Sequence, residues 1–109
     1  MAFNRATDVA TIPSAGTTSL AISVPTRRSL VGVQLPAAMT STAMTFQASN
    51  DDGANWVTIY DESTAYSLTI AASRYQAVKT QVFAGVSLLR IVGGSSEAAA
   101  REVILVFAD

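Results

Sequence analysis

The clearest structural pattern in this chain is Met44-Thr-Phe-Gln-Ala-Ser-Asn-Asp-Asp-Gly-Ala-Asn-Trp-Val-Thr-Ile-Tyr60. Apolar residues at 44, 46 and 48 alternate with polar residues at 45 and 47, as in a strand with one buried face. A polar turn, Asn50-Asp51-Asp52-Gly53, follows, and its glycine can adopt the positive φ that a short hairpin connection requires. The segment therefore predicts an antiparallel β-hairpin. The residues expected to anchor it are Phe46, Gly53, Trp56 and Tyr60.

Similar alternation recurs along the rest of the chain. Further strands are expected over residues 6–12, 17–24, 29–35, 66–70, 75–79, 86–92 and 101–107. Gly32 lies inside one of them, where it suggests a β-bulge or the close approach of another backbone. A single helical turn is expected at residues 80–85, closed by Gly85.

The spacing of these segments indicates the architecture. The strands are short and separated by turns, and no long segment has helical periodicity. This pattern predicts an all-β fold: an antiparallel two-sheet β-sandwich, jelly-roll-like, with about eight strands. Residues 1–5 lack periodicity and are expected to form a short N-terminal arm, followed by a single domain over residues 6–109.

The composition excludes several function classes. The chain has no histidine and no cysteine, so the commonest general base and the thiolate metal ligands are missing. A net charge of −1 provides no long-range field that would attract nucleic acid or an anionic membrane. The chain contains neither a run of about 18 apolar residues nor a signal-peptide pattern. We therefore expect no enzymatic activity, no cofactor, no nucleic-acid or membrane partner, and no passage through a secretory membrane.

The chain is poor in charge. Charged residues make up 14% of it, whereas an ordinary soluble domain has about 25%. Arginine dominates the basic residues, because Lys79 is the only lysine among seven. Such a composition is typical of a surface buried against a partner. An arginine-biased genome would produce the same composition.

Two acidic turns are the candidate metal site. Their carboxylates could gather around calcium if both turns lie at one end of the sandwich. The spacing does not match an EF-hand loop, however, and acidic residues also populate turns because they cap local backbone amides. The second interpretation is favoured. The candidate ligands are Asp51, Asp52, Asp61 and Glu62.

Aromatic and arginine residues are the candidate partner contacts. Trp56 and the three tyrosines, Tyr60, Tyr66 and Tyr75, could form a sugar-stacking platform, although Trp56 is also suited to locking the hairpin onto the core. Arg27 and Arg28 form either a solvated pair or a docking contact for an acidic surface. The partner-binding candidates are Phe3, Arg5, Arg27 and Arg28.

One short segment resembles a known family. Residues 46–58, Phe46-Gln-Ala-Ser-Asn-Asp-Asp-Gly-Ala-Asn-Trp-Val-Thr58, are similar to the Ser-x-Asp-Gly-x-x-Trp hairpin of discoidin-like jelly-roll domains. This resemblance implies the fold and no particular ligand.

A second resemblance covers most of the chain. It runs through Ser29-Leu-Val-Gly-Val-Gln-Leu-Pro-Ala-Ala38, Met44-Thr-Phe-Gln-Ala-Ser49, Trp56-Val-Thr-Ile-Tyr-Asp61, Tyr66-Ser-Leu-Thr-Ile70, Phe83-Ala-Gly-Val86, Leu89-Arg-Ile-Val-Gly-Gly-Ser95 and Arg101-Glu-Val-Ile-Leu-Val106. This order is similar to small β-sandwich virion proteins of tailed bacteriophages that decorate or cement the head.

The phage resemblance implies a function. It implies a non-enzymatic capsid decoration or cement protein, made in the host bacterial cytoplasm and located on the capsid surface of the virion. Its expected partners are the major capsid protein and copies of itself, with a trimer as the expected state. The alternative is a tail- or fibre-associated β-sandwich module that binds a glycan through Trp56 and neighbouring tyrosines.

Overall fold

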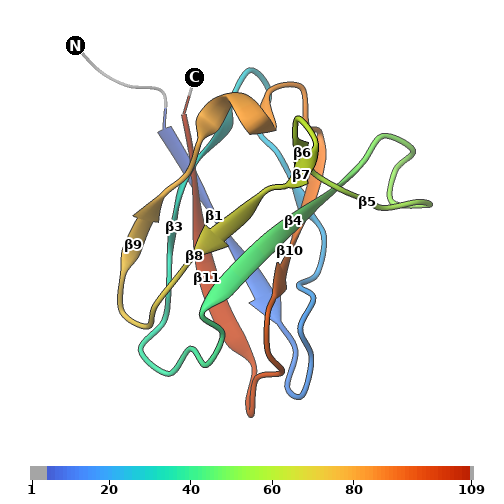
Figure 1. The fold of residues 1–109 in the computed structure, drawn as a ribbon. Coiled ribbons are helices and arrows are strands. Elements are labelled where there is room, and N and C mark those ends of the chain that lie inside the picture. The colour runs from blue at the N-terminus through green and yellow to red at the C-terminus, as the bar shows by residue number, and fades with distance from the viewer. Residues whose placement is uncertain (1–4, 109) are drawn as a thin grey trace.

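The computed structural model describes residues 5–108 and shows two antiparallel sheets stacked face to face (Figure 1). The first, here called the β1 sheet, has the order β1 (Arg5–Ile12), β11 (Arg101–Ala108), β3 (Ser29–Gln34), β9 (Tyr75–Ala77). The second, the β4 sheet, has the order β2 (Ile22–Ser23), β10 (Leu88–Gly93), β4 (Ala43–Ser49), with β5 (Val57–Thr58) and β8 (Ser67–Thr69) both paired to β4. A small hairpin of β6 (Tyr60–Asp61) and β7 (Thr64–Ala65) and a 3₁₀ turn, η1 (Thr80–Phe83), complete the elements.

The strand order is that of a jelly roll. Along the chain, β1 and β3 alternate with β2 and β4 between the two sheets, and then β8 and β10 alternate with β9 and β11. Two interlocked Greek keys produce this order, in which the last strand, β11, lies between the first and third. The predicted all-β sandwich is therefore confirmed. Among the described residues, no helix is long and apolar enough to cross a membrane.

The core lies between the sheets and is filled by the residues that alternate inward. In β11, Val103, Leu105 and Phe107 are fully buried, as their spacing of two requires. Phe46 of β4 meets Phe83 edge to face, with ring centroids 4.9 Å apart. The helical turn predicted at residues 80–85 therefore exists as η1, and it delivers Phe83 to the core.

Two expected elements have different bounds. Residues 17–24 contain only the short strand β2, because the chain there crosses between the sheets: the N–H of Ser19 donates to Ile91 in the β4 sheet, and the N–H of Leu20 donates to Thr11 in the β1 sheet. Leu20 is consequently 63% exposed. Arg5, expected in the arm, is the first residue of β1 and lies opposite Ala108.

The bulge predicted near Gly32 is present. The register of β3 against β11 shifts between Val106 and Phe107, next to the pairing of Gly32 with Val106. The side chain of Tyr75 lies directly over Gly32, where a Cβ atom would collide with its ring. Gly32 therefore allows the Tyr75 side chain to lie across the outside of the sheet.

Candidate functional site

The acidic connection between β4 and β5 is a self-contained turn. It occupies residues 50–56, which is longer than the short turn expected from the sequence. Both carboxylate oxygens of Asp51 accept bonds from within it: the Asn55 side chain at 2.8 Å, the Asn55 main-chain N–H at 2.9 Å and the Ser49 hydroxyl at 2.8 Å. These bonds, led by that of the Asn55 side chain, lower the pKa of Asp51 to about 2. Gly53 has the expected positive φ, +88°.

The four candidate metal ligands do not form a site together. Asp51 is occupied within its own turn, which confirms the amide-capping interpretation for this residue. Asp61 is bound to the ammonium of Lys79 at 2.7 Å, a bond that raises the pKa of Lys79. Within residues 5–108, no three acidic side chains come close enough together to hold a metal ion. Asp52 and Glu62 are exposed at the tips of separate turns.

For two of the four expected hairpin anchors the prediction is wrong. Phe46 is buried as predicted, but Trp56 lies outside the core cluster and Tyr60 is 59% exposed. Trp56 shares its side of the strand with Thr58, which pairs with outward-facing Gln47. Its ring therefore lies on the outer face of the β4 sheet.

Polar groups surround Trp56 on that outer face. The guanidinium carbon of Arg90 lies 4.4 Å from the centroid of the Trp56 ring, in a cation–π contact. Arg90 also donates from Nε to the Gln47 side-chain oxygen at 2.6 Å. Ile59, three residues after Trp56, is the residue that fastens this segment to the core.

The four aromatic residues considered for sugar stacking do not share a face. Tyr66 packs against Phe46 and Phe83 at the core, and its hydroxyl oxygen accepts the main-chain N–H of Lys79 at 2.9 Å. Tyr75 belongs to the other sheet. The predicted platform of four residues is therefore not assembled. Tyr60, which is 59% exposed, follows Trp56 and Thr58 at alternate positions of the chain.

The outer face of the β1 sheet carries an apolar patch. Because Ala10 and Val103 point into the core, their neighbours Val9 and Ile104 point outward and lie opposite each other. The patch continues through Val106 and across Gly32 to β9. We call it the outer β1-sheet face, formed by Val9, Ile104, Val106, Tyr75 and Ala77. Val9 is 42% exposed and Tyr75 52%, whereas Val106 is only 7% exposed.

Three of the four partner-binding candidates lie at one end of the sandwich. Arg5 pairs with Ala108, and Ala108 pairs with Ser29, so the start of β1 lies two strands from the loop that carries Arg27 and Arg28. That loop and residues 84–87 enclose a hollow of about 460 Å³, here called the arginine hollow, lined by residues 24–29 and 84–87. Phe3 lies outside the described residues.

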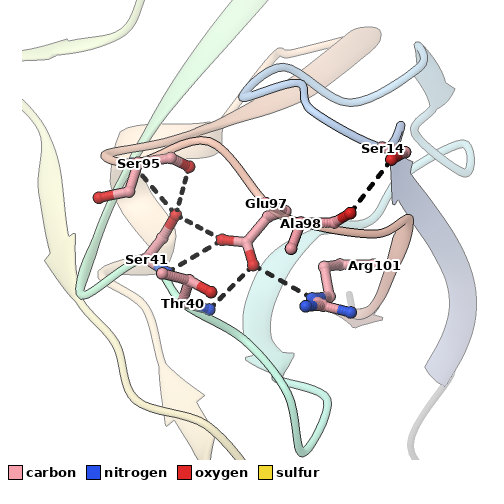
Figure 2. Close-up of polar contacts among 7 residues, drawn as sticks. All are labelled: Ser14, Thr40, Ser41, Ser95, Glu97, Ala98 and Arg101. Atoms are coloured by element: carbon pink, nitrogen blue, oxygen red, sulfur yellow. Dashed lines mark hydrogen bonds and ion pairs between the residues drawn. The ribbon is translucent and has the colours of Figure 1, made fainter.

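Within residues 5–108, no other carboxylate accepts as many hydrogen bonds as that of Glu97, and the sequence did not identify it. It lies in the connection between β10 and β11, yet it is 1% exposed. Figure 2 shows its carboxylate accepting from the main-chain N–H groups of Thr40 and Ser41, each at 2.9 Å, from the Ser41 hydroxyl at 2.8 Å and from Arg101 Nε at 3.1 Å. An arginine four residues later was the only local signal.

The hydrogen bonds to Glu97 determine its protonation state. Burial would raise its pKa, but the bonds from Thr40, Ser41 and Arg101 together outweigh burial and lower the pKa to about 2. A fully bonded carboxylate with so low a pKa is a poor general base at neutral pH. The role of Glu97 is therefore to join residues 40–41 to residues 95–101.

Comparisons with known proteins give only distant structural similarity. No protein-family model and no curated protein matches the chain. The fold is similar to the Yersinia pseudotuberculosis-derived mitogen (17% identity over 98% of this chain and 86% of that chain, TM-score 0.42). It is also similar to the Drosophila NLP core (10% identity over 94% and 95% of the chains, TM-score 0.36). At these values neither similarity bears on function.

Proposed function

We propose that this chain is a non-enzymatic structural protein of a tailed-phage particle, a decoration or cement protein that binds the major capsid protein on the head surface as a homo-oligomer. The phage assignment comes from the resemblance of its sequence to small β-sandwich virion proteins. The structural observation that supports a docking role is the outer β1-sheet face. We assign the contact with the shell to this face.

The chemistry of this face suits a protein partner. Its centre is apolar, and the outward positions of β1 and β11 carry charge only at their ends, on Arg5 and Glu102. An apolar centre with charges confined to the rim is the usual arrangement of a protein–protein interface. Each copy bound to the shell would contribute a modest stabilising free energy, and many bound copies would stabilise the whole shell.

The central test compares shells with and without the protein. Shells assembled from the major capsid protein are expected to resist higher temperature and osmotic stress when the chain is bound. Equal robustness in both preparations would reject the cement role.

A point variant tests the docking face. Val9→Asp places an unpaired charge at the centre of the face and is expected to weaken co-sedimentation with shells by about tenfold or more. Leu20→Asp is the matched control, because Leu20 is exposed but lies outside the face. Unchanged binding of a folded Val9→Asp variant would exclude this face.

One observation favours a second candidate function, the glycan-binding module. Trp56, Arg90 and Gln47 place an aromatic ring, a guanidinium and an amide together on the outer β4 sheet. Such a combination can stack on a sugar ring and bond its hydroxyl groups. Because Trp56 lies outside the core cluster, Trp56→Ala is expected to fold. Loss of glycan-array binding in this variant would support the second function; absence of binding by the wild-type chain would reject it.

A further inference from the structure

We propose that the arginine hollow is a self-association site that receives the tip of the β4–β5 connection of a second copy. In this contact Asp52 of one copy meets Arg27 of the next. The inference deepens the proposed function, on which the homo-oligomer rests, by naming the two surfaces through which copies join.

The charge of the hollow selects an acidic occupant. Its lining, residues 24–29 and 84–87, contains two arginines and no acidic residue. Arg27 is exposed, and within residues 5–108 its side chain makes no hydrogen bond or ion pair. The walls include apolar groups of Val24, Pro25 and Val86, which would partly desolvate a bound carboxylate and strengthen its attraction to arginine.

The hollow at the opposite end of the sandwich lacks this property. It has a volume of about 490 Å³ and is lined by Thr11, by residues 36–38 and by residues 100–102. Its arginine, Arg101, is already bound to Glu97, and the acidic residue Glu102 also lines it. An acidic segment therefore fits the arginine hollow better.

The tip of the β4–β5 connection has the complementary charge. It extends sideways from the sandwich in Figure 1. The carboxylate of Asp51 accepts hydrogen bonds from Asn55 that hold the shape of the turn. The neighbouring Asp52 is exposed, and its carboxylate makes no hydrogen bond or ion pair within residues 5–108. The turn therefore projects one carboxylate that has no partner within residues 5–108. Because the turn is already held in shape, less conformational entropy is lost on binding.

The two surfaces lie side by side at one end of each copy. Ser23 and Ser49 both pair with Leu88, from opposite sides of β10. The arginine loop follows Ser23 and the acidic connection follows Ser49. No ion pair joins the two within residues 5–108. A copy can therefore offer its tip to one neighbour and receive a tip from another, a heterologous contact that forms a ring where the rotation between copies closes.

Charge reversal tests the contact. Arg27→Asp and Asp52→Arg should each weaken self-association by about tenfold or more, because each places like charges together. Mass measurement over a concentration series gives the dissociation constant. An equimolar mixture of the two variants should restore association into even-numbered assemblies, since the tip of each variant fits the hollow of the other. Glu62→Lys, a charge reversal at another exposed turn, should leave association unchanged.

The outcomes separate this inference from the proposed function. Single variants that associate like the wild type, or a mixture that stays dissociated, would overturn the contact. A wild-type chain that is monomeric both in solution and on shells would also overturn it. Co-sedimentation of the same variants with shells is measured in parallel, because shell binding is assigned to the outer β1-sheet face. Loss of self-association with retained shell binding would support both proposals.

Discussion

The pKa values of Asp51 and Glu97 are both lowered to about 2, but the two residues stabilise the protein in different ways. The donors to Asp51 all lie within residues 49–55, and the carboxylate is exposed. The main-chain donors to Glu97 lie 56 and 57 residues away, and that carboxylate is buried. A low pKa therefore reports good hydrogen bonding to the ionised form, whereas burial determines how much stability is lost when the carboxylate is removed.

The largest effect is expected for Glu97→Ala. The substitution leaves the N–H groups of Thr40 and Ser41 and the guanidinium of Arg101 without their partner in a buried place. Loss of one member of a buried pair costs about 3–5 kcal/mol of the free energy of unfolding. Denaturant unfolding measures it. Glu97→Gln keeps the shape and one acceptor oxygen, so it should cost less, about 1–3 kcal/mol; an equal loss in both variants would contradict the hydrogen-bond account.

Gly93→Ala should disturb the hydrogen bonds of Glu97 indirectly, by displacing the Ser41 hydroxyl. A Cβ atom at Gly93 would lie 2.6 Å from the Ser41 hydroxyl, which is fixed by Ser95 and Glu97. Displacement of this hydroxyl is expected to cost about 1–3 kcal/mol. Gly94→Ala is the matched control, because its nearest contact would be an ordinary 3.5 Å. Equal stability of the two variants would show that the Ser41 hydroxyl can move freely.

Acid should weaken the Glu97 cluster. Folding lowers the pKa of Glu97 from its ordinary 4.5 to about 2, so its contribution is complete above pH 4.5 and is lost as pH falls towards 2. The loss across this window is on the order of 3 kcal/mol. The difference in unfolding free energy between wild type and Glu97→Gln, followed from pH 6 to 2, should shrink. A constant difference would contradict the assignment.

The smallest effect is expected for Asp51→Ala. Because this carboxylate is exposed, water can replace it as acceptor for the Asn55 amide. The denaturation midpoint should change less than for either Glu97 variant, while hydrogen exchange of the Asn55 amide should become faster. Asp52→Ala should leave that exchange unchanged, because the Asp52 side chain is not bonded in the turn. If Asp51→Ala lowered the free energy of unfolding more than Glu97→Gln, burial would not determine the cost of removing a carboxylate here.

The parts of the fold predicted correctly are those governed by near neighbours. Alternation identified β4 and β11, because side-chain direction reverses at every residue of a strand. Local preferences also identified the positive φ of Gly53 and the turn at Thr80–Phe83. Residues 17–24 misled the same analysis, since their alternation does not reveal that the chain changes sheet there.

The candidate sites depended on contacts between distant segments. The arginine hollow needs residues 84–87 beside residues 24–29, and the apolar outer face needs β1, β11, β3 and β9 in register. The sequence alone does not decide which side of the sheet Trp56 faces. In the structure Ile59 is buried in the core, so Trp56, three residues earlier, faces outward.

Local chain chemistry was enough to establish an all-β sandwich and a charge-poor chain without histidine or cysteine, because strand periodicity and composition need no knowledge of neighbours in space. Only the assembled jelly roll buried Glu97 and brought its donors within hydrogen-bond distance. The reason is physical: the direction and burial of a polar side chain are determined by whichever distant segment packs over it.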